Sequence, residues 1–495
     1  MSVKEEVLVK ENLENYFQQF SKGVIGSNHY FKTLYGKQKL VYADWIASGR
    51  LYAPIEEKMQ YKIGPMVANT HSFSSETGKA STYAYKLARR IIKEHVNAND
   101  DDVLVTTGTG MTGAIVKLQR LIGLRKSFKH KPNRVDRPVV FITHMEHHSN
   151  HVSWMETLAD VVILDCDENK LVDVNSLEQK LLEYADRPMK IGAFTACSNV
   201  TGIITPYQEL AKIMHKHNGY CVVDFAASAP YVKMDMHPAD PEAYLDAIAF
   251  SPHKFLGGPG SCGVLVFNKK LYNAKCPDTP GGGNVKWTNP WGSYSYFDDI
   301  EVKEDGGTPG FLQTMKAALA IRLKDQMEVS KIHKREEELL QLSYQKLGEI
   351  NGLEILGSTD VPRIGCISFT MPNIHYNLIV RLLNDRFGIQ VRGGWSCAST
   401  YGHYLFDIDR RKSKKITRNI INKDLSNKPG WVRLSLHPLM TNEDVIFISE
   451  ALKEIQKKIA LWKCDYKYNP TTNEWDCLQR GDQEIKQEVC KWFSL

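Results

Sequence analysis

The chain has 495 residues, of which 42% are hydrophobic and 24% are charged. This length and composition predict a globular protein with more than one domain and exclude a disordered or fibrous chain. The formal net charge of +6 is small for the length and argues against a nucleic-acid partner.

The cysteines and the apolar segments indicate the compartment. The 10 cysteines show neither a CxxC pair nor a metal-ligand spacing, so we expect free thiols in a reducing cytoplasm. The first residues lack the basic-then-apolar order of a secretory signal. No stretch approaches the apolar length that spans a bilayer, so no membrane association is expected.

Taken in chain order, residues 1–39 are predicted to form a mostly helical arm. From 40 to 325, short runs of β-branched and aromatic residues alternate with helical segments. This alternation predicts a large α/β domain whose mostly parallel sheet is sandwiched by helices. The expected strands lie at 103–105, 139–142, 161–164, 191–194, 220–223, 247–250 and 264–267.

A smaller α+β domain is predicted at 326–462, from strand-like runs at 366–369 and 432–436 and a final helix. Thr441, with Asp444 three residues later, is a capping signal for that helix. The tail at 463–495 is polar with scattered aromatic residues, and its sequence indicates no function.

An acid and a lysine follow two of the expected strands. Asp224 ends the run at 220–223, and Lys254 comes four residues after the run at 247–250. The carboxyl ends of neighbouring parallel strands are where open α/β sheets bind ligands. Pyridoxal phosphate (PLP) needs this pair, a lysine for its Schiff base and an acid at its ring nitrogen. The sequence therefore predicts a PLP site.

A glycine loop at 108–113 matches the GxGxxG pattern and opens a predicted helix. A nicotinamide site would need an acid at the tip of the next strand, but that strand runs into His144 and Met145. A Walker loop would need Lys and Ser or Thr where Ala114 and Ile115 stand. What remains is a phosphate held by backbone N–H groups at a helix N-terminus, and we assign this role to Gly110, Met111 and Thr112.

Four histidines cluster after the strand at 139–142, at positions 144, 147, 148 and 151. Their spacing fits no standard metal-ligand set, so no metal is expected. A flat imidazole that stacks on the cofactor ring explains one of them better.

These motifs occur in the order found in class V PLP-dependent enzymes of fold type I, the group of cysteine desulfurases and selenocysteine lyases. The resemblance spans about 40–460. It is carried by the segments Tyr42–Ser48, Glu146–Asn150, Ser198–Gly202, Ser251–Lys254, Asp305–Pro309 and Val391–Cys397.

The resemblance assigns roles to single residues. It implies that His147 stacks on the PLP ring, that Asn199 approaches the ring hydroxyl and the substrate, and that Asp224 holds the ring nitrogen. Ser251 and His253 would contact the phosphate, and Lys254 would form the Schiff base. Ala47 would line the substrate pocket, and Arg433 would clamp the substrate carboxylate. Thr308 would reach the phosphate of the neighbouring subunit, which implies a homodimer with shared active sites.

Cys397 stands at the position of the desulfurase nucleophile, in the pattern R-x-G-x-x-C. The resemblance therefore implies conversion of cysteine to alanine with a persulfide on Cys397, which a sulfur-acceptor protein could take over. Three departures stand beside it: Ala227 replaces the usual Gln or His, Trp395 and Ser396 replace histidines, and 398–425 is an insertion that could cap the pocket.

Other readings stay open at this point. A class V aminotransferase, β-lyase or epimerase would use Lys254 in the same way and leave Cys397 structural. A nicotinamide oxidoreductase would rest on the glycine loop. A non-catalytic scaffold or RNA-binding protein would be expected to have lost Lys254 or Asp224, and this chain retains both.

Overall fold

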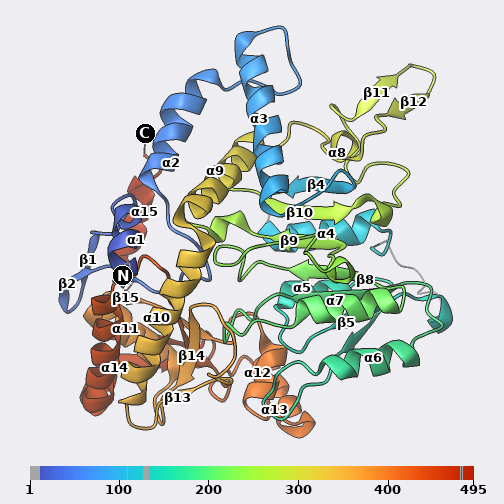
Figure 1. The fold of residues 1–495 in the computed structure, drawn as a ribbon. Coiled ribbons are helices and arrows are strands. Elements are labelled where there is room, and N and C mark those ends of the chain that lie inside the picture. Colours follow the sequence, from blue (N-terminus) through green and yellow to red (C-terminus); the bar gives the residue numbers. More distant parts are fainter. Residues whose placement is uncertain (1–11, 109, 126–132, 480, 482, 495) are drawn as a thin grey trace, which may run out of the picture.

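The computed structural model describes residues 12–494 except 109, 126–132, 480 and 482. Its centre is a seven-stranded sheet (Figure 1). Five neighbouring strands run parallel, and β10 is antiparallel to both of its neighbours. The spatial order is β4 (Asp102–Thr107), β10 (Gly263–Asn268), β9 (Ala247–Phe250), β8 (Tyr220–Asp224), β7 (Lys190–Thr195), β5 (Val139–Ile142) and β6 (Asp160–Ile163).

Helices cover both faces of this sheet (Figure 1). One face packs against α3 (Glu76–His95), α6 (Val174–Glu183), α7 (Tyr207–Lys216) and α9 (Phe311–Met327). The other face packs against α4 (Gly110–Leu121) and α5 (His148–Met155). The predicted α/β architecture with a mostly parallel, helix-covered sheet is confirmed.

The strand sequences explain this burial. In β5, Phe141 packs into the core of the first face, while Val140 and Ile142 pack into the core of the second. A strand that is buried on both faces reads as a continuous apolar run, because successive side chains point to opposite sides.

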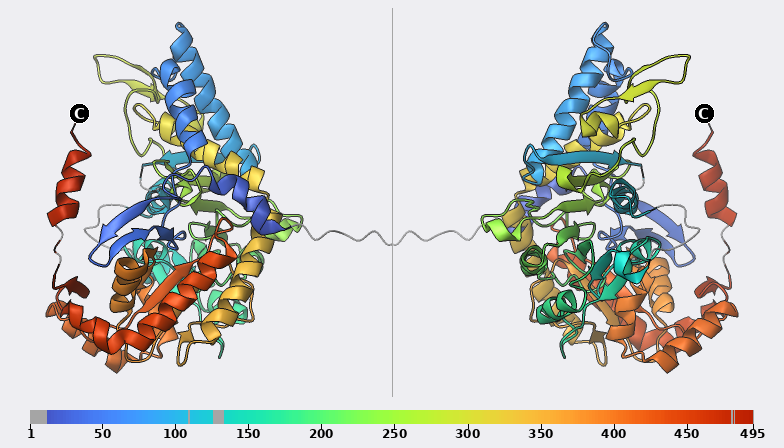
Figure 2. Two further views of the ribbon diagram at one scale, coloured as in Figure 1. Left: turned by 90° about the vertical axis from the view of Figure 1, so that its left-hand side faces the viewer. Right: turned by 90° about the vertical axis from the view of Figure 1, so that its right-hand side faces the viewer.

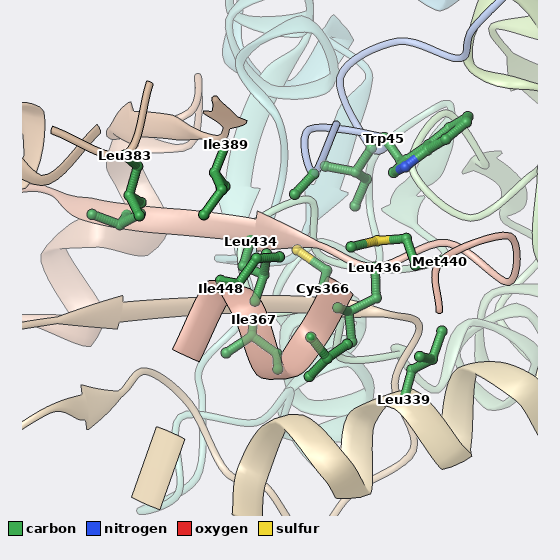
Figure 3. Close-up of a cluster of buried hydrophobic side chains, with 14 of the residues drawn as sticks. Trp45, Leu339, Cys366, Ile367, Leu383, Ile389, Leu434, Leu436, Met440 and Ile448 are labelled. Atoms are coloured by element: carbon green, nitrogen blue, oxygen red, sulfur yellow. The ribbon is translucent and has the colours of Figure 1, made fainter. Parts of the chain in front are cut away.

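A second, antiparallel sheet forms the smaller domain, in the order β13 (Glu354–Ile355), β14 (Cys366–Thr370), β17 (Trp431–Ser435) and β16 (Arg392–Gly394). The helices of this domain are α10 (Val329–Gly348), α11 (Tyr376–Phe387) and α14 (Asn442–Trp462). Figure 3 shows part of its core, where Ile367 and Leu434 of the sheet lie beside Ile448 of α14, and Leu339 of α10 belongs to the same buried cluster.

The two parts are joined at two places. Between α9 and α10 the chain bends at Glu328, whose φ is +58°. Near the other end of the large domain, β3 (Val41–Tyr42) pairs in parallel with β15 (Ile389–Gln390) of the smaller part. The large-domain range 40–325, the small-domain range 326–462 and the tail 463–495 stay predictions.

The described part of the arm, residues 12–39, is less helical than expected. Residues 1–11 lie outside the described part, and the rest forms α1 (Leu13–Ser21) and a hairpin of β1 (Tyr30–Thr33) and β2 (Gly36–Lys39). A two-stranded hairpin with few buried side chains carries little apolar periodicity, so the sequence signal is weak.

The insertion and the tail both contain regular structure. The insertion folds into α12 (Ser399–Leu405) and α13 (Arg410–Ile421), and the tail into β18 (Tyr466–Asn469), β19 (Glu474–Cys477) and α15 (Gln483–Lys491). Figure 2 shows α15 at the outer edge of the molecule. Other short elements include α2 (Ala53–Lys58), α8 (Ile300–Lys303), β11 (Val285–Thr288) and β12 (Tyr294–Tyr296). Among the described residues, no helix combines the length and the apolar character that crossing a membrane requires.

Candidate active site

A pocket of about 220 Å³ lies at the carboxyl ends of β8 and β9. It brings together residues that are separated by more than 380 positions in the sequence. The predicted site residues in its lining are Ala47, Met111, Thr112, His147, Asn199, Asp224, Ser251, His253, Lys254, Cys397 and Arg433.

Two predicted residues are outside this lining. Gly110 lies behind it: its φ is +60°, and a Cβ there would come within 2.9 Å of Ser251 Oγ. Glycine is therefore required for the start of α4 to approach the serine this closely. Thr308 is exposed on the turn before α9, so the structure does not bring it to the pocket of its own chain.

Asp224 and Lys254 form the electrostatic centre of the pocket. Asp224 is buried, and its Oδ1 accepts a 2.8 Å hydrogen bond from the N–H of Ala226. Burial raises the pKa of Asp224 to about 6, against the opposing effects of that hydrogen bond and of Lys254. Burial lowers the pKa of Lys254 to about 8, although the charge of Asp224 opposes the shift. Each group therefore holds the other in its charged form at a site where desolvation disfavours charge.

The N-terminus of α4 closes one end of the pocket. The N–H of Met111 donates a 2.8 Å hydrogen bond to Ser251 Oγ, and Thr112 Oγ1 lies 2.7 Å from Ser149 Oγ. Backbone N–H groups, hydroxyls and the positive end of the helix dipole are all ligands that suit a phosphate. His253 lies beside them, with a pKa lowered by burial and by Lys254.

His147 forms the N-cap of α5, and its Nδ1 accepts from the N–H of Ser149 at 3.1 Å. Burial, and then the charge of Lys254, lowers the pKa of His147 to about 3. The ring is therefore a neutral, flat imidazole at neutral pH. This is the form that stacks on an aromatic ring without adding a cation.

Glu146 supports the segment before His147, a role that the sequence reading did not assign. It is buried, and its Oε1 accepts from Thr143 Oγ1 at 2.7 Å and from the N–H of Thr195 at 2.9 Å. Burial raises the pKa of Glu146 to about 8. The sequence signal that could have identified Glu146 is its position directly before His147 and His148.

Two arginines share one carboxylate at the other side of the pocket. Arg433 is buried and donates from Nη2 to Asp44 Oδ1 at 2.8 Å, while Arg392 Nε lies 3.2 Å from Asp44 Oδ2. A second donor of Arg433, Nη1, bonds the carbonyl oxygen of Asn199 at 3.0 Å. Arg392 also lines the pocket, and the sequence reading missed both Arg392 and Asp44.

Asn199 also has a free acceptor in the described structure. Its Nδ2 donates to the carbonyl oxygen of Ser396 at 2.7 Å, whereas its buried Oδ1 has no hydrogen-bond partner among the described residues. A buried polar atom without a partner is costly, so this oxygen is available for a ligand group with a donor.

Cys397 is exposed at the pocket, in a loop with unusual backbone. Ser396 and Cys397 have φ values of +48° and +57°. Non-glycine residues rarely adopt this left-handed region, and each such residue stores strain that its surroundings must offset. Here Asn199 holds Ser396, and the N–H of His148 donates to the carbonyl oxygen of Cys397 at 2.8 Å.

The other histidines of the cluster have structural contacts. His148 Nε2 lies 2.7 Å from Ser399 Oγ, and His151 Nδ1 lies 3.1 Å from Thr400 Oγ1. His144 Nε2 lies 3.0 Å from the carbonyl oxygen of Lys170. Within the described ranges, no group of three or more His, Cys, Asp and Glu side chains is arranged to hold a metal.

The insertion borders the pocket rather than covering it. Ser396 and Cys397, just before the insertion, belong to the lining, whereas none of the described residues 398–425 does. Ala227 also lines the pocket, so the position that carries Gln or His elsewhere offers no side-chain donor here.

The family model described as Aminotransferase class-V matches residues 41–447 of this chain. The chain belongs to the aminotransferase class-V family. This membership confirms the predicted class V, PLP-dependent enzyme.

Known relatives of this class-V enzyme include two curated proteins. A protein from Halalkalibacterium halodurans, named a probable cysteine desulfurase, is 30% identical over 371 residues, which are 74% of this chain and 86% of the relative. A probable cysteine desulfurase from Staphylococcus aureus is 26% identical over 425 residues, 85% of this chain and 93% of the relative. The solved apo structure of a cysteine desulfurase from Thermococcus onnurineus NA1 has a TM-score of 0.71 at 22% identity. It covers 89% of this chain and 98% of that one, and supports the fold.

Proposed function

We propose that this class-V enzyme is a PLP-dependent cysteine desulfurase, which converts cysteine to alanine and retains the sulfur as a persulfide on Cys397. The observation that carries the proposal is the position of Cys397. It is exposed and lines the same pocket as Lys254 and Asp224. The names of the curated relatives support the same activity.

The residues of the pocket fit PLP. Asp224 would bond the ring nitrogen, and His147 would stack on the face of the ring. The buried Oδ1 of Asn199, which has no partner among the described residues, would accept from the ring hydroxyl. Met111, Thr112, Ser251 and His253 would hold the phosphate, with Thr308 of a second subunit. When bound to Lys254, PLP supplies an electron sink for the substrate's Cα.

The pocket also orients the substrate and moves its proton. Arg433, backed by Asp44, offers a planar guanidinium for the carboxylate of an amino acid, and Ala47 leaves room beside it. The lowered pKa of Lys254, about 8, leaves a useful fraction of neutral amine near neutral pH. A neutral amine at this place can take the proton from the substrate's Cα.

Cys397 performs the sulfur step. Its thiolate attacks the substrate sulfur, so that an S–S bond forms as the substrate's Cβ–S bond breaks. The electron pair of the broken bond stays with the carbon skeleton, which takes up protons and leaves as alanine. The sulfur remains on Cys397 as a persulfide, and no external oxidant or reductant is needed.

The test is alanine and persulfide formation from cysteine by the holoenzyme. We expect Cys397→Ser to abolish both products while PLP stays bound, and Lys254→Ala to abolish turnover altogether. Cys464→Ser is the matched control, because Cys464 is exposed outside the pocket lining. If the Cys397→Ser protein still forms alanine, or still transfers the amino group to a 2-oxo acid, the result would instead favour an aminotransferase, β-lyase or epimerase.

We also propose a homodimer with shared active sites in the cytoplasm. Thr308 is exposed in its own chain, which suits a residue that serves a neighbouring pocket. The 10 cysteines are all free thiols, as a reducing compartment favours. Mixing Lys254→Ala with Thr308→Asp subunits should restore activity, because one mixed site then holds both native residues. Absence of complementation in a verified mixed dimer contradicts the sharing.

A further inference from the structure

Helix α13 carries a dense cluster of positive charge. Six cations project from it and all are exposed: Arg410, Arg411, Lys412, Lys414, Lys415 and Arg418. None of the six has a carboxylate partner within ion-pair distance among the described residues. From 410 to 428 the sequence has eight Lys and Arg residues and one Asp, an excess larger than the net charge of +6 for the whole chain. The chain therefore concentrates its positive charge in this segment.

This helix is linked through α12 to the loop that carries Cys397. Helix α12 begins two residues after Cys397, and its seven residues span about 10 Å. His403 Nε2 of α12 lies 2.9 Å from Ser413 Oγ of α13, so the two helices are joined side by side. The hydrogen bonds from His148 and His151 hold the start of α12 on α5. Figure 1 shows α12 and α13 together at the lower edge of the molecule.

Positive charge continues from α13 toward the pocket. Lys428 lies over the ring of Trp395, 5.5 Å from the ring centroid. Trp395 itself stands two residues before Cys397 in the chain. After burial, the charge of Lys428 is the second cause that lowers the pKa of His148. Arg392, with half of its side chain exposed, lines the pocket itself. A negatively charged partner that approaches α13 is therefore attracted toward the exposed thiol.

The end of α13 adds apolar surface to the charge. Ile420 is 39% exposed and Ile421 is 74% exposed, next to Arg418 and Lys423. Phosphate backbones of nucleic acids are held mainly by charge, whereas protein interfaces combine basic and apolar contacts. The apolar contribution therefore favours a protein over a nucleic acid. The link through α12 to the loop of Cys397 favours a protein over a membrane, because a protein thiol can accept the sulfur and a lipid surface cannot.

We propose that α13 is the docking site for an acidic surface of a thiol-bearing protein, which takes the sulfur from Cys397. The proposal rests on the desulfurase function above. The partner's thiolate attacks the outer sulfur of the persulfide, and a new S–S bond forms on the partner. The S–S bond to Cys397 breaks, and Cys397 leaves as a thiolate. The exchange has no net oxidation or reduction.

The test uses holoenzyme loaded with cysteine and two synthetic peptides that each carry one Cys, one rich in Glu and the other rich in Lys. The measured quantity is the rate of sulfur transfer to each peptide, followed by mass spectrometry. We expect the Glu peptide to accept sulfur about tenfold faster at low salt, and the preference to shrink at high salt as charges are screened. Dithiothreitol serves as an acceptor without charge.

Charge reversal on α13 should invert the preference. Lys414→Glu with Arg418→Glu should slow transfer to the Glu peptide and speed transfer to the Lys peptide, while transfer to dithiothreitol stays unchanged. The matched control reverses two exposed lysines on other helices, Lys334→Glu with Lys457→Glu, and should leave the preference intact. Equal effects of the two double variants would overturn the proposal, because net charge alone would then explain them.

Binding is measured separately, with a fluorescent Glu peptide that lacks Cys and the Cys397→Ser protein. Loss of this binding in the α13 variant supports docking even if no persulfide ever forms. Failure to transfer sulfur to dithiothreitol counts against the desulfurase function, whereas transfer to dithiothreitol without a peptide preference counts against docking alone. Tighter α13-dependent binding of an RNA oligonucleotide, or of vesicles with anionic lipid, would overturn the choice of a protein partner.

Discussion

The N–H of His148 donates a 2.8 Å hydrogen bond to the carbonyl oxygen of Cys397. On the same residue, the imidazole Nε2 accepts from the N–H of Ser399 at 3.1 Å. His148 therefore holds the backbone at Cys397 and again at Ser399, next to His147 at the N-cap of α5. These bonds offset the strain of the left-handed backbone at Ser396 and Cys397.

His148 is accordingly a positioning residue for Cys397. We expect His148→Phe to lower the rate of alanine formation about tenfold, because the loop loses a side-chain acceptor and a nearby misplacement of the nucleophile is costly. Absorbance of bound PLP should stay unchanged. His151→Phe, which loses only the contact to Thr400, should have a smaller effect. Equal losses in both variants, or loss of PLP in the first, would contradict the assignment.

Arg433 should control substrate affinity through its geometry. Its two terminal nitrogens are oriented by Asp44 and by the carbonyl oxygen of Asn199, an arrangement that a single ammonium cannot reproduce. We expect Arg433→Lys to raise KM for cysteine about tenfold or more, with a smaller change in kcat. Arg120→Lys, at an arginine paired with Asp278, is the control. A kcat effect without a KM effect would assign Arg433 to the chemical step instead.

The sequence predicts site residues best where the end of a single strand determines the position of a side chain. Asp224 and Lys254 follow buried apolar runs, so their meeting at one sheet edge follows from parallel pairing alone. Asp44 and Arg392 are separated by 348 positions, and only the packing of β3 beside the smaller sheet brings them together. Thr308 cannot be placed from one chain, because its expected role belongs to a second subunit.

The insertion shows another limit of sequence patterns. The basic run at 410–415 forms the first half of α13, a helix with no buried residue. Its apolar residues Ile416 and Ile420 lie one turn apart on the same face, but two apolar residues among six cations are a weak sequence signal for a helix. What marks its start is Asp409, whose side chain accepts from the N–H of Lys412.

The capping box predicted for the last helix is present and gives a stability prediction. Thr441 Oγ1 accepts from the N–H of Asp444 at 3.0 Å, and Asp444 Oδ2 accepts from the N–H of Thr441 at 2.9 Å. Thr441→Ala should lower the free energy of unfolding by about 1 kcal/mol, because α14 loses a capped N–H group. Urea unfolding measures it, with the exposed Thr417→Ala as control. No loss relative to that control would show that water replaces the cap.

Glu336 should make stability depend on pH. It is buried, and its Oε1 accepts from the N–H of Gly365 at 2.8 Å. Burial raises the pKa of Glu336 from 4.5 to about 8. Between these two values the folded chain binds this proton more tightly than the unfolded chain, so this group's contribution to stability falls as pH rises.

Glu336→Gln removes that titration and keeps an oxygen to accept from Gly365. At pH 5 the variant and the native chain should unfold at similar urea concentrations. At pH 8 the variant should be more stable by on the order of 3 kcal/mol, since each pKa unit corresponds to about 1.4 kcal/mol. Glu183→Gln, at an exposed carboxylate, should show no such difference. If the difference in unfolding free energy between the variant and the native chain is the same at both pH values, the pKa of Glu336 is not raised. Glu336 is then ionised in the folded protein, and another interaction offsets the cost of burying its charge.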